Sequence, residues 1–468
     1  MRPLLVIDAV GLAWRHVGER TPNLRALRER GAGAPMTSVL PAVTCSAQAS
    51  MLTGLEPGAR EGRPGHGVVG NGWFDREYHE VGFWKQSNAL VSGEKLYETA
   101  RHRDPAFTCA KLFWWWNMGA RVDWSVTPRP HYPADGRKLL DVYGQPEDFR
   151  AQLVDELGPF PFFDFWGPRS GLASSRWIAD ATIATLRRHR PTLTLAYLPH
   201  LDYDHQRYGP DDERSLKALE ELDVLVGDLV AAADEVGGAT VVVSEYAIEP
   251  VSRPILPNRA LREAGLLEVR QPPPSPAGGH VGERLDLFAS RAFCVVDHQL
   301  AHVQVRSAED LPRVRALLAE LPGVATVLEG EAKAAAGLDH PRAGDLVLLS
   351  EPDAWFAYNF WLDDAAAPDF APTVAIHDKP GYDPAELFVD PTIATPKLRV
   401  ASRLLRKKLG LRYLMDVIPL DPSLVGGSHG LLPAAPERGP VFLSTEPFDD
   451  ALVEMTSVKE RLLGLMFD

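Results

Sequence analysis

Short apolar runs alternate with amphipathic segments along the first half of the chain. Residues 3–9 read PLLVIDA, an apolar run that closes on Asp8 and Ala9. Such a run is typical of a buried parallel strand that delivers a side chain to the carboxyl edge of a sheet. Thr21-Pro22-Asn23-Leu24 then has the proline of a helix start, and the helical pattern stops near Gly31. We therefore expect a strand, a loop and a helix, with Asp8 at a functional edge.

The same alternation recurs further along the chain. A helix is predicted over 174–189, a strand over 192–198, a long acidic helix over 211–236 and a strand over 239–244. Alternating strands and helices indicate an α/β fold with a doubly wound, mostly parallel sheet flanked by helices.

Two stretches interrupt this pattern. Residues 84–167 are crowded with Trp, Phe and Pro and show no clean period; we interpret the aromatic side chains as packing, with a pocket wall as the alternative. Residues 252–350 begin with a Pro/Gly-rich linker at 271–279 and continue as strand, helix, strand and a further apolar run. We therefore expect a small α+β subdomain over 252–350, inserted in a catalytic domain formed by 1–251 and 351–468.

Composition narrows the class of protein. The chain has 468 residues, of which 45% are hydrophobic and 24% charged, as in a folded globular protein, and its net charge is −14. That acidic balance argues against binding to nucleic acid, which needs a clustered basic surface. The one basic cluster, Arg403 to Arg412, is interpreted as the solvated face of a helix, with an anionic-substrate or membrane-surface patch as the runner-up.

The cysteines and the apolar runs bear on compartment. Cys45, Cys109 and Cys294 are an odd number at wide spacings, which favours neither a disulfide framework nor a structural zinc site. The first apolar run is broken by Asp8, and no run is long enough to span a bilayer. We expect a cytoplasmic protein without stable membrane insertion.

Two motifs carry candidate phosphoryl-transfer chemistry, which needs an activated hydroxyl and groups that neutralise phosphate oxygens. The first is 41–54, PAVTCSAQASMLTG, which contains Thr44, and the second is 66–71, HGVVGN, which ends in Asn71. Taken singly, such residues are usually caps or turn residues, and Asp8 could simply cap a helix. Their joint order along the chain is what indicates a function.

In that order the motifs resemble the alkaline phosphatase superfamily, and within it the type I phosphodiesterase/nucleotide pyrophosphatase family. In both, a threonine lies ten residues before the glycine of a Thr-Gly pair, here Thr44 and Gly54. The resemblance implies that Thr44 is the nucleophile and that Asn71 donates a hydrogen bond to the transferring phosphoryl group. It extends to 381–384 (GYDP) and 427–430 (GSHG), and in relatives the histidine of the latter, here His429, binds a metal.

Two departures from the family pattern concern metal ligands. Asp202 matches the family's Asp, but the matching His position falls on Gln206 while His205 comes one residue early, a slip that a loop could absorb. The family's Ser-Asp-His-Gly reads Ser-Glu-Tyr-Ala at 244–247, so that Glu245 replaces the aspartate and Tyr246 the histidine.

The resemblance implies two divalent metal ions. Asp8, Thr44 and Glu245 would surround one, and Asp202, His205 or Gln206, and His429 the other. The ions would be zinc, or Mg²⁺, Mn²⁺ or Ca²⁺ because the donor set is rich in oxygen. Other histidines that could compensate are His298, His302 and His377.

The expected function is metal-dependent hydrolysis of a phosphodiester or pyrophosphate bond through a phospho-threonine intermediate. The substrate would be a small phosphodiester, a nucleotide, or a prenyl or lipid phosphate, since the chain resembles a subfamily often encoded beside a prenyltransferase. A non-catalytic binding relative with a degenerate metal site is the alternative, and a phosphoryl or head-group transferase is a third possibility.

Overall fold

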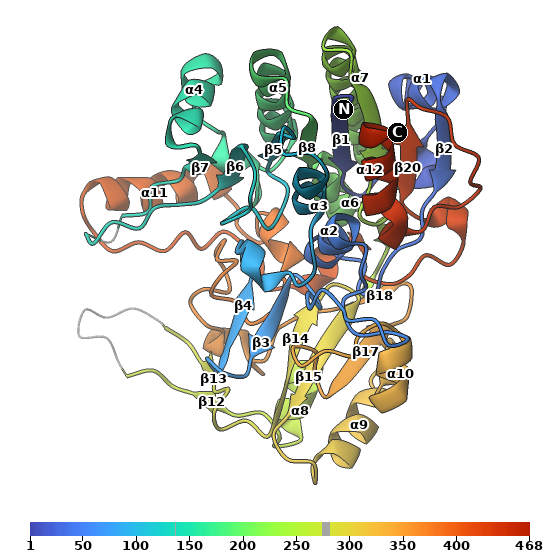
Figure 1. Ribbon diagram of the computed structural model, residues 1–468. Coiled ribbons are helices and arrows are strands. Elements are labelled where there is room, and N and C mark those ends of the chain that lie inside the picture. Colours follow the sequence, from blue (N-terminus) through green and yellow to red (C-terminus); the bar gives the residue numbers. More distant parts are fainter. Residues whose placement is uncertain (136, 274–280) are drawn as a thin grey trace.

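The computed structural model describes residues 1–135, 137–273 and 281–468. Its centre is an eight-stranded sheet with the order β2-β20-β9-β1-β8-β5-β6-β7 (Figure 1). The five strands from β9 to β6 are parallel, and β2, β20 and β7 pair antiparallel at the edges. The strands are β1 (Leu4–Ala9), β2 (Ala32–Pro35), β5 (Cys109–Leu112), β6 (Trp124–Pro128), β7 (Val142–Gln145), β8 (Leu193–Leu198), β9 (Ala239–Val243) and β20 (Val441–Ser444). The predicted α/β class with a mostly parallel sheet is confirmed.

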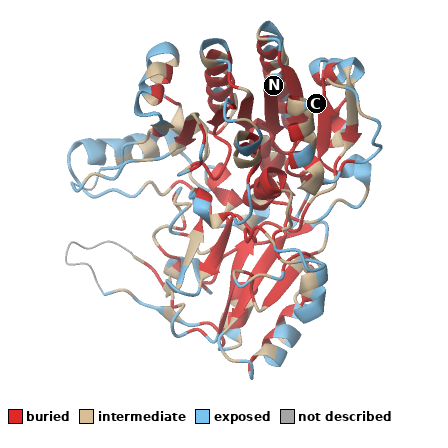
Figure 2. Cartoon of the chain, in the orientation of Figure 1, coloured by how far each residue is buried: buried red, intermediate tan, exposed pale blue. Residues whose placement is uncertain are grey.

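Helices cover both faces of this sheet. Side chains alternate along β1, so Leu5 and Ile7 pack on one face and Leu4 and Val6 on the other. The first face is covered by α1 (Pro22–Arg30), α4 (Glu147–Leu157), α5 (Leu172–His189) and α7 (Glu213–Glu235). The second is covered by α2 (Thr44–Thr53), α3 (Leu96–Arg103) and α12 (Val458–Phe467). Both faces of the central strands are therefore buried (Figure 2).

A second, smaller sheet lies within 252–350. Its order is β14-β15-β17-β16, all antiparallel, with β14 (Ala292–Asp297), β15 (Leu300–Val305), β16 (Val324–Leu328) and β17 (Leu346–Ser350). Helices α8 (Pro257–Glu263) and α9 (Leu311–Ala319) pack on it, and α10 (Gly330–Ala335) follows β16. Helix α9, strand β16 and the apolar run that forms β17 correspond to the predicted pattern. The single strand predicted from 292 to 305 is the hairpin of β14 and β15, and helices α8 and α10 were not predicted. Of the predicted linker at 271–279, residues 274–279 lie outside the described residues.

The aromatic stretch at 84–167 supplies three strands of the main sheet, β5, β6 and β7, which its sequence pattern does not reveal. The side chains of Trp114, Trp115 and Trp116 are buried, as the packing interpretation predicts. Because these strands span four or five residues each, their periodicity is too short to read among the surrounding Trp and Pro.

The remaining α-helices are α6 and the exposed helix α11, and the remaining strands are short. They are α6 (His200–Tyr208), α11 (Pro396–Lys408), β3 (Gly72–Asp75), β4 (Glu80–Phe83), β10 (Glu249–Pro250), β11 (Arg253–Ile255), β12 (Val269–Arg270), β13 (Arg284–Leu285), β18 (Ala354–Phe356) and β19 (Gly427–Ser428). Among the described helices, none combines the length and the apolar character that a bilayer crossing would need. All three cysteines are free and buried.

Candidate active site

Three buried carboxylates gather at the carboxyl edge of the main sheet. Asp8 is the penultimate residue of β1, and Glu245 lies two residues after the end of β9. Asp202 lies in the first turn of α6, the helix that follows β8. Because β8, β1 and β9 are parallel neighbours, their carboxyl ends meet at one edge. Asp8 alternates in phase with Leu4 and Val6, so it faces the side covered by α2.

Helix α2 brings two polar side chains to this edge. Thr44 is its first residue and Gln48 lies one turn later, so both are on one face. The Gln48 side-chain NH₂ donates to Glu245 Oε1 at 2.5 Å and to Asp8 Oδ2 at 3.2 Å. The Gln48 carbonyl accepts from the backbone N–H of Trp115 at 2.6 Å, which fixes the orientation of the amide. Gln48 therefore joins the two carboxylates from one side.

Thr44, Tyr246 and Asp202 form a hydrogen-bonded chain. The Tyr246 hydroxyl donates to Asp202 Oδ1 at 3.1 Å, and it lies 3.2 Å from the Thr44 hydroxyl. A phenol has one proton, and this one goes to Asp202, so the Thr44 hydroxyl is the donor to Tyr246. The His429 ring stacks on Tyr246 with centroids 3.5 Å apart, and its Nε2 lies 4.0 Å from Asp202 Oδ1.

Burial sets the protonation of these groups. It raises the pKa of Asp202 to about 6, against the lowering effect of the hydrogen bond from Tyr246 and of the nearby Gln206 amide. It raises the pKa of Glu245 to about 7, and that of Asp8 well above its usual value, where the neighbouring Glu245 charge raises it further. Burial lowers the pKa of His429 to about 3, so this imidazole is neutral near pH 7. Its Nδ1 donates to the Ala42 carbonyl at 2.8 Å, which leaves Nε2 as the acceptor.

Asn71 lies just before β3 and is held by the second sheet. Its backbone N–H donates to Asp297 Oδ2 at 2.6 Å and its amide N–H₂ donates to Asp297 Oδ1 at 3.1 Å. The side-chain carbonyl oxygen of Asn71 accepts from the backbone N–H of Cys45, the residue after Thr44, at 3.0 Å. One of the two amide N–H groups is used by Asp297, so the other is available beside Thr44.

Residues 200–208 form helix α6 where a loop was expected, and this decides which side chain accompanies Asp202. In a helix a slip of one residue turns a side chain by about 100°. Gln206, one turn after Asp202, accepts from the Tyr382 hydroxyl at 2.9 Å, and its amide lowers the pKa of the nearby Asp202 carboxyl. His205 instead packs edge-on against His16, with centroids 5.5 Å apart.

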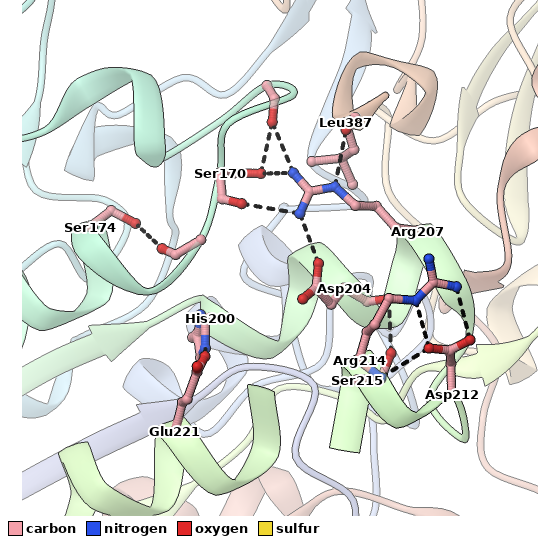
Figure 3. Close-up of polar contacts among 12 residues, drawn as sticks. Ser170, Ser174, His200, Asp204, Arg207, Asp212, Arg214, Ser215, Glu221 and Leu387 are labelled. Atoms are coloured by element: carbon pink, nitrogen blue, oxygen red, sulfur yellow. Dashed lines mark hydrogen bonds and ion pairs between the residues drawn. The ribbon is translucent and has the colours of Figure 1, made fainter. Parts of the chain in front are cut away.

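The orientation of α6 is fixed by two of its side chains, Arg207 and His200, that bond to neighbouring elements. The Arg207 guanidinium donates to the backbone carbonyls of Ser170 and Leu387 and pairs with Asp204 at 2.8 Å (Figure 3). His200, at the start of the helix, hydrogen-bonds to Glu221 of α7 at 2.9 Å. These contacts prevent α6 from rotating to bring His205 toward Asp202.

Of the three other histidines, one reaches the cluster. The His298 ring packs on His429 with centroids 3.7 Å apart and stacks on Tyr382. His302 hydrogen-bonds to the Val69 carbonyl through Nε2 at 2.8 Å and serves the core. His377 is exposed at the surface, and its pKa is lowered by desolvation and raised slightly by a hydrogen bond at the Phe83 backbone.

The donor atoms fit one cation better than two. Asp8 Oδ1 and Glu245 Oε2 are buried and have no hydrogen-bond partner, and the Thr44 hydroxyl adjoins Glu245, so two carboxylates and a hydroxyl could hold one hard cation. At the other position Asp202 and His429 Nε2, also unpartnered, supply two donors only, because His205 faces His16. Among the described residues no group of three or more His, Cys, Asp or Glu is arranged to hold a metal ion.

Two members of the cluster, Gln48 and Asp297, were not anticipated from sequence. Gln48 stands four residues after Thr44, and the helical spacing could have placed it on the same face. Asp297 had no such signal, because it reaches Asn71 from a distant strand.

The layered sheet and the polar cluster at its carboxyl edge define an alkaline phosphatase-like α/β protein. The family model of type I phosphodiesterase/nucleotide pyrophosphatase matches residues 4–383. The chain belongs to this family, which classes it with hydrolases.

Solved structures share the fold over nearly the whole chain. Phosphonoacetate hydrolase from Sinorhizobium meliloti in complex with phosphonoformate has a TM-score of 0.61 at 16% identity, covering 99% of this chain and 96% of that one. Murine ectonucleotide pyrophosphatase/phosphodiesterase 5, an inactive threonine-to-alanine variant in complex with AMP, has a TM-score of 0.58 at 14% identity, covering 100% and 95%.

A curated relative is an uncharacterized pyrophosphatase/phosphodiesterase of Schizosaccharomyces pombe. It is 24% identical over 212 residues, which is 45% of this chain and 36% of that protein. The matched part thus spans little more than a third of that relative.

Proposed function

We propose that the protein hydrolyses a phosphodiester or pyrophosphate bond in two steps, with Thr44 as the nucleophile. The observation that carries the proposal is the hydrogen-bonded chain from the Thr44 hydroxyl through Tyr246 to Asp202. It gives the hydroxyl at the start of α2 a path for its proton, and a positioned acceptor is what makes a weak nucleophile reactive. Family membership supports the same reaction type.

In the first step Thr44 Oγ attacks phosphorus, and the bond from phosphorus to the leaving-group oxygen breaks. The Thr44 proton passes to the Tyr246 oxygen as the Tyr246 proton passes to Asp202, whose pKa of about 6 leaves it ionised and able to accept near neutral pH. The free amide N–H of Asn71 and the N-terminal end of α2 stabilise the charge on the phosphoryl oxygens. Water then attacks phosphorus and loses a proton to solvent, the bond from Thr44 Oγ to phosphorus breaks, and the proton on Asp202 returns through Tyr246 to Thr44 as the phosphate product leaves.

We further propose that Asp8, Glu245 and Thr44 hold one divalent cation. Such a cation neutralises phosphate oxygens and lowers the pKa of a bound hydroxyl. The donors are all oxygen, which favours Mg²⁺ or Mn²⁺ over zinc. Gln48 holds the other oxygen of each carboxylate, and so leaves Asp8 Oδ1 and Glu245 Oε2 directed to the cation. The proposed compartment is the cytoplasm, which suits three free, buried cysteines.

Substitution of Thr44 tests the nucleophile. Thr44→Ala should abolish turnover of an activated aryl phosphodiester, while Thr44→Ser should keep part of it because a hydroxyl remains. Thr53→Ala, at the other end of α2, is the matched control, since Thr53 bonds only to the nearby backbone of Ala49 and Leu55. Mass spectrometry of the quenched reaction should find a phosphoryl adduct on Thr44. Full activity in Thr44→Ala would show that another group attacks phosphorus.

A second candidate is a binding relative without turnover. It is favoured by the degenerate second metal position and by the closure of the site, where Thr44 is 3% exposed, so that ligand entry requires neighbouring side chains to move. This candidate predicts that AMP or an aryl phosphodiester raises the melting temperature without being hydrolysed, in wild type and in Thr44→Ser alike. Turnover that depends on Thr44 excludes it.

A further inference from the structure

Helix α11 presents its apolar side chains to solvent. Leu398 and Leu405 of the helix and Leu409, its C-cap residue, recur at intervals of seven and four, so they lie on one face. Their exposed fractions are 68%, 57% and 64%. No residue of α11 is buried, and the helix reaches away from the body of the molecule (Figures 1 and 2). A surface helix of a globular protein turns its apolar face inward, and this one does the reverse.

The inward side of α11 is held by charge. Arg403 donates to Asp416 Oδ1 and Oδ2 at 2.9 Å each, Arg399 also pairs with Asp416, and Val400 packs on a small cluster with Val417. The leucine face therefore cannot turn inward without breaking these ion pairs. The outward orientation is built into the contacts of the helix.

Basic side chains flank the leucine face. From 391 to 415 the chain has no Asp or Glu, whereas Lys397, Arg406, Lys407 and Lys408 join the two paired arginines on α11. Among the ion pairs of the described residues, none involves Lys397, Lys407 or Lys408, all of which are exposed. A chain with a net charge of −14 thus concentrates positive charge around one apolar stripe.

Helix α11 belongs to the segment 390–417, whose two ends lie side by side. The Asp390 N–H donates to the Val417 carbonyl at 2.8 Å, and this hydrogen bond joins the two ends of the segment. Beyond the helix, Leu411, Tyr413 and Leu414 continue the exposed apolar surface, with exposed fractions of 53%, 41% and 39%. Leucine and aromatic side chains between lysines and arginines are the side-chain set of a helix that lies in a membrane interface.

We propose that α11 and residues 409–414 dock the protein on a membrane surface that carries anionic lipids. The leucines enter the boundary between headgroups and acyl chains, and the lysines contact the lipid phosphates. This interface binding needs no spanning helix and does not depend on the proposed hydrolase activity. A free polyanion offers nothing to the leucine stripe, so the apolar face selects a membrane over a soluble anionic ligand.

Sedimentation with vesicles tests the proposal on the full chain. At low ionic strength the protein should bind vesicles of equal parts phosphatidylcholine and phosphatidylglycerol, and should bind phosphatidylcholine vesicles weakly. Substituting Lys397, Lys407 and Lys408 together by Gln should lower the partition coefficient on the order of 100-fold, because each cation near such a surface contributes roughly fivefold. Leu398→Ser with Leu405→Ser should lower it by roughly tenfold for each leucine.

Matched controls separate this surface from general charge and apolar effects. Arg20→Gln with Arg30→Gln and Lys217→Gln removes the same charge from exposed positions near α1 and α7, and Leu432→Ser with Leu452→Ser removes two other exposed leucines. Both controls should bind like wild type, and thermal melts should show all variants folded. The proposal is overturned by no binding to anionic vesicles, by equal binding of the α11 variants, or by a dimer in solution that the leucine variants dissolve.

Discussion

Tyr246 stands where the resemblance to the family pattern predicts a histidine, and its hydroxyl lies between Thr44 and Asp202. We predict that Tyr246→Phe loses turnover by at least about 100-fold, since the path for the Thr44 proton is gone. The phenyl ring still stacks on His429, so the variant should fold. Steady-state kinetics with an aryl phosphodiester checks the loss. Unchanged kcat would mean that the Thr44 proton leaves by another route.

Glu245 is predicted to be the residue that retains the cation. Glu245→Ala removes one of the two carboxylates with an unpartnered oxygen, and should lose bound metal, whereas Tyr246→Phe should keep it. Metal analysis of protein purified without chelator should find close to one equivalent in wild type. Equal loss in both variants would make Tyr246 a ligand, and two equivalents in wild type would restore the second position.

Asp297 should make stability depend on pH. Burial raises its pKa to about 7 from 3.8, so between these values the folded state holds a proton that the unfolded state has lost. Stability from this group is therefore full at low pH and falls as pH rises toward 7, by on the order of 4 kcal/mol. We predict that Asp297→Asn, which cannot ionise, loses less free energy of unfolding than wild type between about pH 4 and pH 8.

Chemical denaturation at about pH 4 and pH 8 measures the difference. The exposed Asp449→Asn is the control and should follow wild type at both values. If wild type and Asp297→Asn lose the same free energy of unfolding between the two pH values, the raised pKa of Asp297 is wrong.

The sequence motifs could place a residue at the site when it stood at the end of a strand. Asp8 and Glu245 met this condition, because parallel strands share a carboxyl edge. His205 could not be placed, since its direction depends on α6 being a helix with a fixed rotation. Asp297 could not be foreseen either, because its partner Asn71 comes from a distant part of the chain. Side-chain direction and long-range contacts are set by packing, which a motif does not contain.

At the scale of elements, helix α2 organises the site through Gln48. We predict that Gln48→Leu lowers the free energy of unfolding by about 3 kcal/mol, because two carboxylates lose a donor and the buried Trp115 N–H loses its acceptor. Chemical denaturation measures this. Gln152→Leu is the control, since the half-buried Gln152 makes one side-chain hydrogen bond, to the exposed Asp148. A loss in Gln48→Leu no larger than in the control would mean that the amide contacts carry no stability.

The elements with the longest patterns could be predicted and the shortest could not. The predicted strands and helices correspond to β1, β8, β9, α1, α5 and α7 within two residues at each end. Strands β5 to β7 were not predicted, because they are only a few residues long and lie among buried tryptophans. The strand conformation of such short segments is determined by tertiary packing. The boundaries of the inserted subdomain at 252 and 350 stay a prediction.

The charge of the whole molecule bears on substrate choice. The net charge is −14, and among the described residues no Lys or Arg acts on the pKa of Asp8, Asp202 or Glu245. A phosphate monoester carries one more ionised oxygen than a diester and needs a cationic clamp such as Arg. We predict a higher kcat/KM for an aryl diester than for the matching monoester at equal ionic strength. A clear preference for the monoester would contradict this.

The strand order of the main sheet also constrains how the protein folds during synthesis. Strand β20 lies between β2 and β9, so β2 has no other neighbour in the sheet. On the ribosome, β2 emerges early and β20 very late, and until then the open side of β9 offers unpaired backbone groups to any passing strand. A nascent chain stalled before Val441 therefore exposes the unpaired edge of β9, which is prone to aggregate unless a chaperone binds it. His429 emerges in the same late interval, so the protein acquires its completed sheet and its completed site together.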